Sequence, residues 1–355
     1  MILSWYLTKA YLTRFFSLLL GLVVFLQMLD LLANADSVLE GGGQAVDTLS
    51  RYIMLRVPSI IETVAPLAGL LGALTALVVL ARNSEIIAMR AAGRSVLSLV
   101  GGLVGVGAIL AVILFFFSDQ VVVRFNAQLE DWKSTGYKPG GEIVDGTEAW
   151  VIEGDTIIRV GHVLQNGSVL NDIRLFNQTD TDAVADIINI RLAIWEETGW
   201  NLFEVARVGG NGQDLPVDQP TWETNLTPDD FNKLANPPSE LTFDELEHYV
   251  RELALGTRPE YYYDTWLQRK LAGPMVLALM PLLAAIAAFA HHRQGSAIMV
   301  VVYGISLGFV FIVTDNMLLA MGQFGALPPI IAAWLPLALF GTIGLWIVVN
   351  LENNG

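Results

Sequence analysis

The sequence predicts a helical membrane protein with six transmembrane helices and an all-β, jellyroll-like domain inserted between helices three and four. Three observations support this fold class. The 355-residue chain is 54% hydrophobic and 15% charged, with a mean hydropathy of +0.52, as in integral membrane proteins. Several apolar runs are long enough to cross a bilayer, which takes about 20 helical residues. A middle segment, residues 118–264, is acidic and contains short runs of β-forming residues.

The distribution of charge limits the classes of partner. Residues 118–264 contain 27 Asp and Glu against 10 Lys and Arg, whereas the rest of the chain contains 8 against 10. Nucleic acid is therefore not an expected partner, because its phosphates require a basic surface. Cysteine is absent, so the chain has neither disulfides nor thiolate metal sites.

Three spans precede the acidic segment, and they are predicted at Leu12–Ala33, Val57–Ala81 and Val96–Phe117. The first run has no small-residue cleavage site after it, so we expect a retained span rather than a signal peptide. Lys9 and Arg14 at its start place the N-terminus in the cytoplasm. Small residues allow helices to pack closely, and the third span has four such positions: Gly101, Gly102, Gly105 and Gly107.

The acidic segment is predicted to be a periplasmic β-domain. Its β-branched and aromatic runs are Ala149–Ile152, Thr156–Val160, Ile173–Phe176, Ile187–Trp195 and Leu202–Val208. Turn signals separate the runs without intervening helices, which favours a sandwich or jelly roll. The runs alternate only loosely, so register is not assigned. Thr242 and Glu245 form a capping box that begins a closing helix.

Three further spans are predicted at Leu271–Ala290, Ala297–Met321 and Pro328–Val349. His291 and His292 follow the fourth span; adjacent residues face different sides of a helix, which favours inner-surface polarity over a metal site. The resulting domains are residues 1–117, 118–264 and 265–355. We expect a multi-pass protein of a bacterial inner membrane with both termini in the cytoplasm.

No Gly-x-x-x-x-Gly-Lys-Ser/Thr motif occurs, so the chain itself is not expected to hydrolyse ATP. We therefore expect no catalytic residue, metal or cofactor on this chain.

Charged residues lie near the outer ends of the spans, where a charge is costly and often functional. The acids are Asp30, Glu62 and Asp315, and the cations are Arg51, Arg56, Arg269 and Lys270. Three interpretations remain open. The charges pair with one another or reach the interface, the cations form a rim that holds a charged lipid head group, or the acids relay protons.

A charged stretch, residues 82–94, separates spans two and three and carries three arginines, which indicates a cytoplasmic position. Glu85 within it has two interpretations. It pairs with Arg82 on a helix surface, or it is a docking carboxylate for a soluble ATPase.

Four separated stretches point to a known family. They are Asn83–Gly93 (NSEIIAMRAAG), Trp222–Pro228 (WETNLTP), Gly304–Phe311 (GISLGFVF) followed by Asp315, and Leu327–Ile331 (LPPII). In this order they resemble the lipopolysaccharide-export permeases of the LptF/LptG (YjgP/YjgQ) family. The second and third stretches look closer to the LptG branch.

The resemblance implies a permease subunit of an ABC transporter that extracts lipopolysaccharide, or an equivalent glycolipid, and passes it to a periplasmic bridge of the LptC/LptA type. It implies an LptF-type permease partner and an LptB-type ATPase dimer, which would bind the ATP and Mg. The residues that would couple to the ATPase are Arg82, Ser84, Glu85, Ile86, Met89, Arg90 and Gly93.

The β-domain would then receive acyl chains. Candidates for an acyl groove are Trp150, Ile152, Ile158, Ile190, Ile194, Phe203 and Val205. An ordinary sandwich core is the alternative for these residues.

One departure concerns the lipid phosphates. Well-known LptG proteins carry lysines at the outer end of the first span, whereas Leu31–Gly43 here has no Lys or Arg and contains Asp36 and Glu40. Arg51 and Arg56 are the expected substitutes. Two other function classes stay open: an ATPase-coupled signal transmitter without lipid transport, and a proton-coupled secondary transporter that depends on the three acids.

Overall fold

The computed structural model describes residues 2–353 except 43, 84, 92, 94, 139–147, 154–155, 166, 179–183, 197–198, 210–212, 216–220, 223, 236–237, 239–240, 253–258 and 291–296. The chain divides into two compact units. One comprises Met1–Ala35, Leu49–Asn126 and Asp264–Gly355, and the other comprises Asp36–Thr48 and Ala127–Tyr263.

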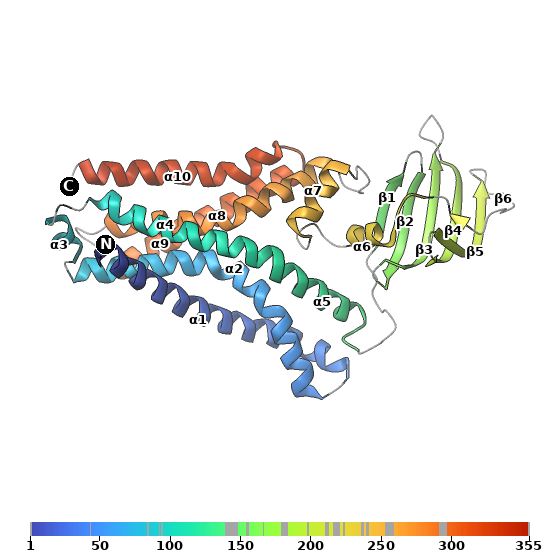
Figure 1. Ribbon diagram of the computed structural model, residues 1–355, viewed down its shortest axis with the longest axis horizontal. Helices are drawn as coiled ribbons and strands as arrows, with labels where there is room; N and C mark the ends of the chain where they lie inside the picture. The colour runs from blue at the N-terminus through green and yellow to red at the C-terminus, as the bar shows by residue number, and fades with distance from the viewer. Residues whose placement is uncertain are drawn as a thin grey trace. The chain divides into compact units, whose positions relative to one another are not determined.

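In the described part of the chain, six helices are long and apolar enough to cross a membrane, which confirms the predicted spans. They are α1 (Ile2–Glu40), α2 (Ala45–Arg82), α4 (Val96–Phe117), α8 (Glu260–Ala290), α9 (Ala297–Gln323) and α10 (Pro329–Asn353). The short helix α3 (Glu85–Ala91) follows α2. Figure 1 shows α3 at the end of the helical bundle where both termini lie.

Several helices extend beyond their apolar stretches. The predicted first span covers Leu12–Ala33, yet α1 has 39 residues. A helix continues wherever its backbone bonds are satisfied, whereas hydropathy reports only the part that suits lipid. The third span continues through a π-helical turn, η1 (Ser118–Val122), into α5 (Val123–Ser134).

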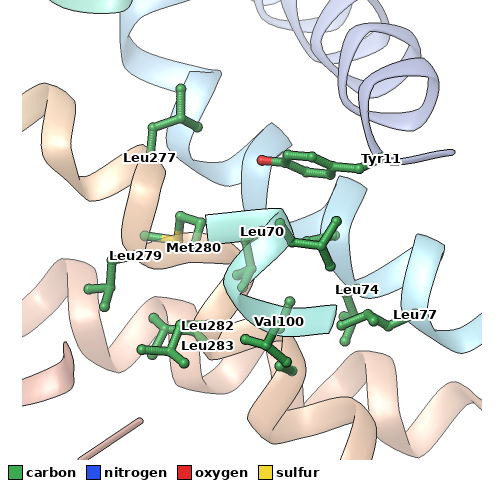
Figure 2. Close-up of a cluster of buried hydrophobic side chains, with 14 of the residues drawn as sticks. Tyr11, Leu70, Leu74, Leu77, Val100, Leu277, Leu279, Met280, Leu282 and Leu283 are labelled. Carbon is green, nitrogen blue, oxygen red and sulfur yellow. The ribbon is translucent and has the colours of Figure 1, made fainter. Parts of the chain in front are cut away.

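The core of the bundle lies around α2 and α8. Its fully buried leucines include Leu70 and Leu74 of α2 and Leu283 of α8. Figure 2 shows how side chains from α1, α2, α4 and α8 meet there, with Tyr11 and Val100 among them. This packing gives the six spans one shared apolar core.

Only one of the four predicted packing glycines of α4 lies against another helix. A Cβ at Gly107 would lie 2.8 Å from the Leu277 carbonyl oxygen and 3.0 Å from the Ala278 Cα of α8. At Gly101, Gly102 and Gly105, a Cβ would meet nothing within 4 Å. Close packing within the chain is therefore confirmed at Gly107, and close packing of the other three glycines stays a prediction.

Within the described residues, the segment between the third and fourth spans forms one antiparallel sheet, which confirms its predicted all-β class. Its strands are β1 (Ala149–Glu153), β2 (Thr156–Leu164), β3 (Val169–Gln178), β4 (Val184–Glu196), β5 (Gly199–Gly209), β6 (Asp214–Leu215) and β7 (Thr221–Trp222). Each strand from β1 to β5 pairs with the next in sequence, and β7 pairs with β5. The helices α6 (Pro228–Ala235) and α7 (Phe243–Glu252) follow.

The loose alternation of the strands has a structural cause. The core residues of β3 are Leu170, Ile173 and Leu175, and those of β5 are Trp200, Leu202 and Val205. In each strand, two successive core residues are therefore three positions apart, where regular alternation would place them two apart. Asp172 and Glu204, within those intervals, have positive φ angles of 51° and 54°.

In β2 and β4, the alternation of core residues also changes, at the positions that lie opposite Asp172 and Glu204. Their core residues are Val160 and Val163 in β2, and Ile190 and Ala193 in β4. The breaks at Gly161, Asp172, Arg191 and Glu204 thus form one row across the sheet, which we call the break row. The pairing register continues unchanged on both sides of this row.

One end of the apolar sheet face is covered by the chain that leads into α6. The indole Nε1 of Trp200 donates to the Leu226 carbonyl at 2.8 Å, and Phe231 of α6 is fully buried against Trp200. The capping box of α7 is confirmed: the Thr242 N–H donates to Glu245 at 2.7 Å, and the Glu245 N–H donates to the Thr242 hydroxyl at 3.3 Å.

We expect Gly107→Ala to destabilise the bundle by about 1–3 kcal/mol, because the added methyl group would press on the α8 backbone. The matched control is Gly105→Ala in the same helix, where the methyl group has open space and alanine favours the helix by up to about 1 kcal/mol. Thermal unfolding of the purified protein in detergent measures both. Equal destabilisation by the two variants would contradict the packing described here.

Candidate functional site

A short charged helix, α3, forms the predicted coupling segment between spans two and three. Glu85 lies in its first turn, where a carboxylate suits the positive end of the helix dipole. Gly93, just beyond its end, has a φ of +82°, a conformation that glycine adopts without strain.

The face of α3 that carries Met89 packs against the spans. Met89 is 5% exposed and packs in a cluster with Leu7 of α1, Leu80 of α2 and Leu99 of α4. Phe289 of α8 packs against the same cluster. A movement of α3 would therefore press directly on four of the six spanning helices.

The Glu85 carboxylate is half-buried and accepts hydrogen bonds from two neutral groups. The Tyr6 hydroxyl donates to it at 3.4 Å, and the Asn83 amide donates at 3.2 Å. The Glu85 contacts found within the described residues are thus with Tyr6 and Asn83, not with the exposed Arg82. Ser84 and the side chains of Ile86 and Arg90 lie outside the described residues.

Charged residues near the ends of the spans opposite to α3, which are predicted to be the outer ends, form further polar contacts, which we call the outer polar layer. Asp30 of α1 accepts a hydrogen bond from the Tyr52 hydroxyl at 2.7 Å and pairs with Arg56 Nε at 3.2 Å. Both partners belong to α2. The first contact of the layer thus joins the first two spans.

The π-helical turn η1 provides the next two contacts. Ser118 Oγ donates to Glu62 of α2 at 2.5 Å. Asp119 lies 3.5 Å from Lys270 of α8, and both of these side chains are about nine-tenths buried. A π-helical turn adds one residue to the helix. It therefore sets the directions in which the Ser118 and Asp119 side chains point.

Arg269 and Asp315 form a bidentate ion pair between α8 and α9. Arg269 Nη1 lies 2.8 Å from Asp315 Oδ1, and Nη2 lies 2.7 Å from Oδ2. The Asp315 side chain is only 5% exposed. Next to this pair, the Trp334 indole of α10 donates to Gln268 at 3.2 Å.

The outer polar layer therefore links neighbouring helices. Each of the three predicted acids contacts a partner on a neighbouring segment, and each partner is a neutral or cationic group. Among the predicted cations, Arg56, Arg269 and Lys270 lie in ion pairs. The side chain of Arg51 on α2 is exposed.

Sequence reasoning missed Tyr52, Ser118 and Asp119 as members of this layer. Asp119 directly follows the third span, which was the available signal. The π-helical turn that points it at Lys270 has no such signal in the sequence.

The predicted acyl-groove residues lie on both faces of the sheet. Ile158, Ile190 and Val205 belong to the core face. Trp150, Ile194 and Phe203 alternate with core residues and lie on the opposite face, where Phe203 is 45% exposed. The Ile152 side chain lies outside the described residues.

Polar groups mark the borders of this domain's apolar surfaces. On the core face, Asp186 is buried, accepts from the Asn177 amide at 3.1 Å and pairs with Arg207 at 2.5 Å. On the opposite face, Arg159 donates to Glu148 and Asp172, and these hydrogen bonds raise the pKa of its guanidinium.

Within the described ranges, no three His, Asp or Glu side chains gather where they could hold an ion. His291 and His292 lie outside those ranges.

The combination of six spans, a short helix between spans two and three, and an inserted β-sheet agrees with a comparison of sequences. Residues 5–350 match the model of the lipopolysaccharide export system permease family LptF/LptG. The chain belongs to the LptF/LptG family. This family assignment confirms the resemblance carried by the four sequence stretches.

Two curated relatives extend the comparison along the LptF/LptG chain. The lipopolysaccharide export system permease protein LptG of Escherichia coli (strain K12) is 26% identical over 346 residues, which cover 95% of this chain and 96% of the relative. The protein of the same name from Haemophilus influenzae (strain ATCC 51907 / DSM 11121 / KW20 / Rd) is 26% identical over 355 residues, 97% of each chain. The similarity therefore includes both the spans and the β-domain.

We expect Asp315→Asn to destabilise this LptF/LptG protein by about 3–5 kcal/mol, because it leaves the Arg269 charge without its bidentate partner. The double variant Arg269→Met with Asp315→Leu should recover most of the loss, since it removes both charges. Thermal midpoints of the single and double variants in detergent measure the coupling. A double variant as unstable as Asp315→Asn would contradict it.

Proposed function

We propose that this chain is an LptG-type permease subunit of an ABC transporter in the bacterial inner membrane. It extracts lipopolysaccharide, or an equivalent outer-membrane glycolipid, and passes it to a periplasmic bridge of the LptC/LptA type. A separate LptB-type ATPase dimer drives the process, and an LptF-type permease completes the membrane unit. The observation that carries the proposal is the seating of α3 on four spans through Met89.

The proposed coupling works by displacement of α3. Its inner face is fixed by Met89, while Glu85 at its start is accessible enough to meet a partner. When the ATPase subunits close on ATP, they move α3, and the Met89 cluster carries that displacement into α1, α2, α4 and α8. In this arrangement the N- and C-termini are cytoplasmic and the β-domain is periplasmic.

The proposed cargo explains the need for a motor. Removing a lipid from the bilayer exposes its acyl chains at a cost of about 0.8 kcal/mol for each CH₂ group that meets water. Apolar surfaces along the route reduce this cost. The spans expose large apolar side chains such as Phe25 and Phe309, and the β-domain exposes Phe203.

The competing classes lack such support. A signal transmitter needs a coupling helix and an outer domain but no lipid route, so the family membership and the exposed apolar surfaces favour transport. A proton relay needs a continuous chain of groups that pass protons along the spans. Asp30 and Asp315 are instead held in ion pairs with Arg56 and Arg269, which join neighbouring helices.

Replacing Glu85 tests the coupling. We expect Glu85→Ala to reduce retention of the LptB-type ATPase in a co-purification at least tenfold, because the docking carboxylate is lost. Tyr6→Phe is the matched control, since it removes the 3.4 Å hydrogen bond to Glu85 and leaves the carboxylate in place. If the two variants lose the ATPase equally, Glu85 acts only in local structure. If wild type retains no ATPase, the proposed function is wrong.

The two arginines of the outer half of α2 test the cargo. We expect Arg51→Ala with Arg56→Ala to lower photo-crosslinking of lipopolysaccharide to α1 and α2 severalfold, because these cations are the proposed substitutes for phosphate-binding lysines. The control is Asp30→Asn, which removes the partner of Arg56 but keeps both cations. Unchanged crosslinking in the double variant would exclude a role for these arginines in lipid capture.

A further inference from the structure

The first turn of α4 is held partly by a residue from the far end of the chain. A helix begins with backbone N–H groups that have no partner within the helix. The Ser95 hydroxyl accepts from the Ser98 N–H at 3.0 Å, as a local N-cap does. The N–H groups of Val96 and Leu97 instead donate to the Glu352 carboxylate, at 2.6 and 3.3 Å.

Glu352 lies in the last turn of α10, so its carboxylate bridges two helices. A carboxylate that accepts from backbone N–H groups forms a charge-assisted hydrogen bond, and the positive end of the α4 dipole adds to the attraction. The capping of α4 therefore depends on the position of α10. Local sequence provides only the Ser95 part of this cap.

The connection from α3 to α4 is short. Residues 92–95 join them, with Gly93 in a positive-φ conformation and Ser95 extended. Met89 of α3 and Leu99 of the first turn of α4 also pack in the same buried cluster. The short link and this shared packing together couple a displacement of α3 to the first turn of α4. That turn is the one that Glu352 holds.

The Met89 cluster and Glu352 thus connect α3 to different helices. The cluster takes its residues from α1, α2, α3, α4 and α8. The Glu352 carboxylate adds α10 to the set of helices that respond to α3.

We propose that Glu352 is a positioning residue for transport: it fixes the start of α4 to α10, so that movement of α3 is delivered to α10. The inference rests on the proposed function, because it takes the movement of α3 from the ATPase. Loss of the carboxylate separates ATP hydrolysis from lipid movement, since α3 still binds the ATPase through its own residues while α10 no longer follows.

The first experiment measures coupling in the complete transporter in proteoliposomes, with wild type, Glu352→Ala, Glu352→Gln and Asn353→Ala. We expect Glu352→Ala to keep ATPase binding and hydrolysis within about twofold of wild type and to lower the lipopolysaccharide released per ATP at least fivefold. Glu352→Gln keeps an acceptor oxygen and should recover part of the ratio. Asn353 is exposed on the same turn, and its replacement should leave the ratio unchanged.

Two results would overturn the proposal. An unchanged lipid-to-ATP ratio in Glu352→Ala excludes a role in coupling. The second result is a parallel fall in ATPase binding, ATP hydrolysis and lipopolysaccharide release, with an unchanged amount of lipid released per ATP. If Glu352→Gln shows the same fall, the residue only maintains the fold.

A second experiment separates this inference from the proposed function. The chain has no cysteine, so spin labels at Leu97→Cys and Asn353→Cys report the separation of α4 and α10 without background labelling. In the chain without an ATPase, Glu352→Ala should broaden the distance distribution. A distribution as narrow as in wild type shows that Glu352 does not hold the two helices together, whether or not the ATPase proposal stands.

Discussion

Charged side chains inside apolar spans need partners within the protein, and this requirement organises the outer part of the bundle. The contacts form a sequence of links: Asp30 joins α1 to α2, Glu62 joins α2 to η1, Asp119 joins η1 to α8, and Asp315 joins α8 to α9. The adjacent Arg269 and Lys270 extend to different neighbours, so α8 is held from two sides. Breaking one link leaves a charge in an apolar environment, which is more costly than losing an apolar contact of similar size.

The end of the bundle that carries α3 has contacts of a different kind. There the contacts are an apolar cluster around Met89, hydrogen bonds from neutral groups to Glu85, and the Glu352 carboxylate on backbone N–H groups. Apolar contacts are not directional, so they allow small shifts that an ion pair of fixed geometry resists. The bundle thus combines one end held by specific pairs with an end around α3 that can adjust, as the proposed coupling through α3 requires.

The sequence predicted the spans, the β-class of the inserted domain and the capping box at Thr242, because each depends on local composition or on spacing along the chain. It did not predict which charges pair. Pairing depends on how each helix is rotated, and the π-helical turn that contains Asp119, the partner of Lys270, changes that rotation without a sequence signal. The same limit explains why Gly107 packs on α8 while Gly105 does not. Strand register could not be assigned from the sequence for another reason, because the alternation of core residues changes at the break row.

The break row has a practical consequence for mapping the β-domain by chemical labelling. A cysteine scan usually takes reactivity at every second residue as one face of a strand. In β5, Trp200 and Leu202 share a face with Val205, so even-numbered sites before Glu204 and odd-numbered sites after it report the same surface. The parity switches at the corresponding residue in β2, β3 and β4. A scan interpreted with one parity throughout would assign half of each strand to the wrong side and would make a continuous lipid contact look like two separate ones.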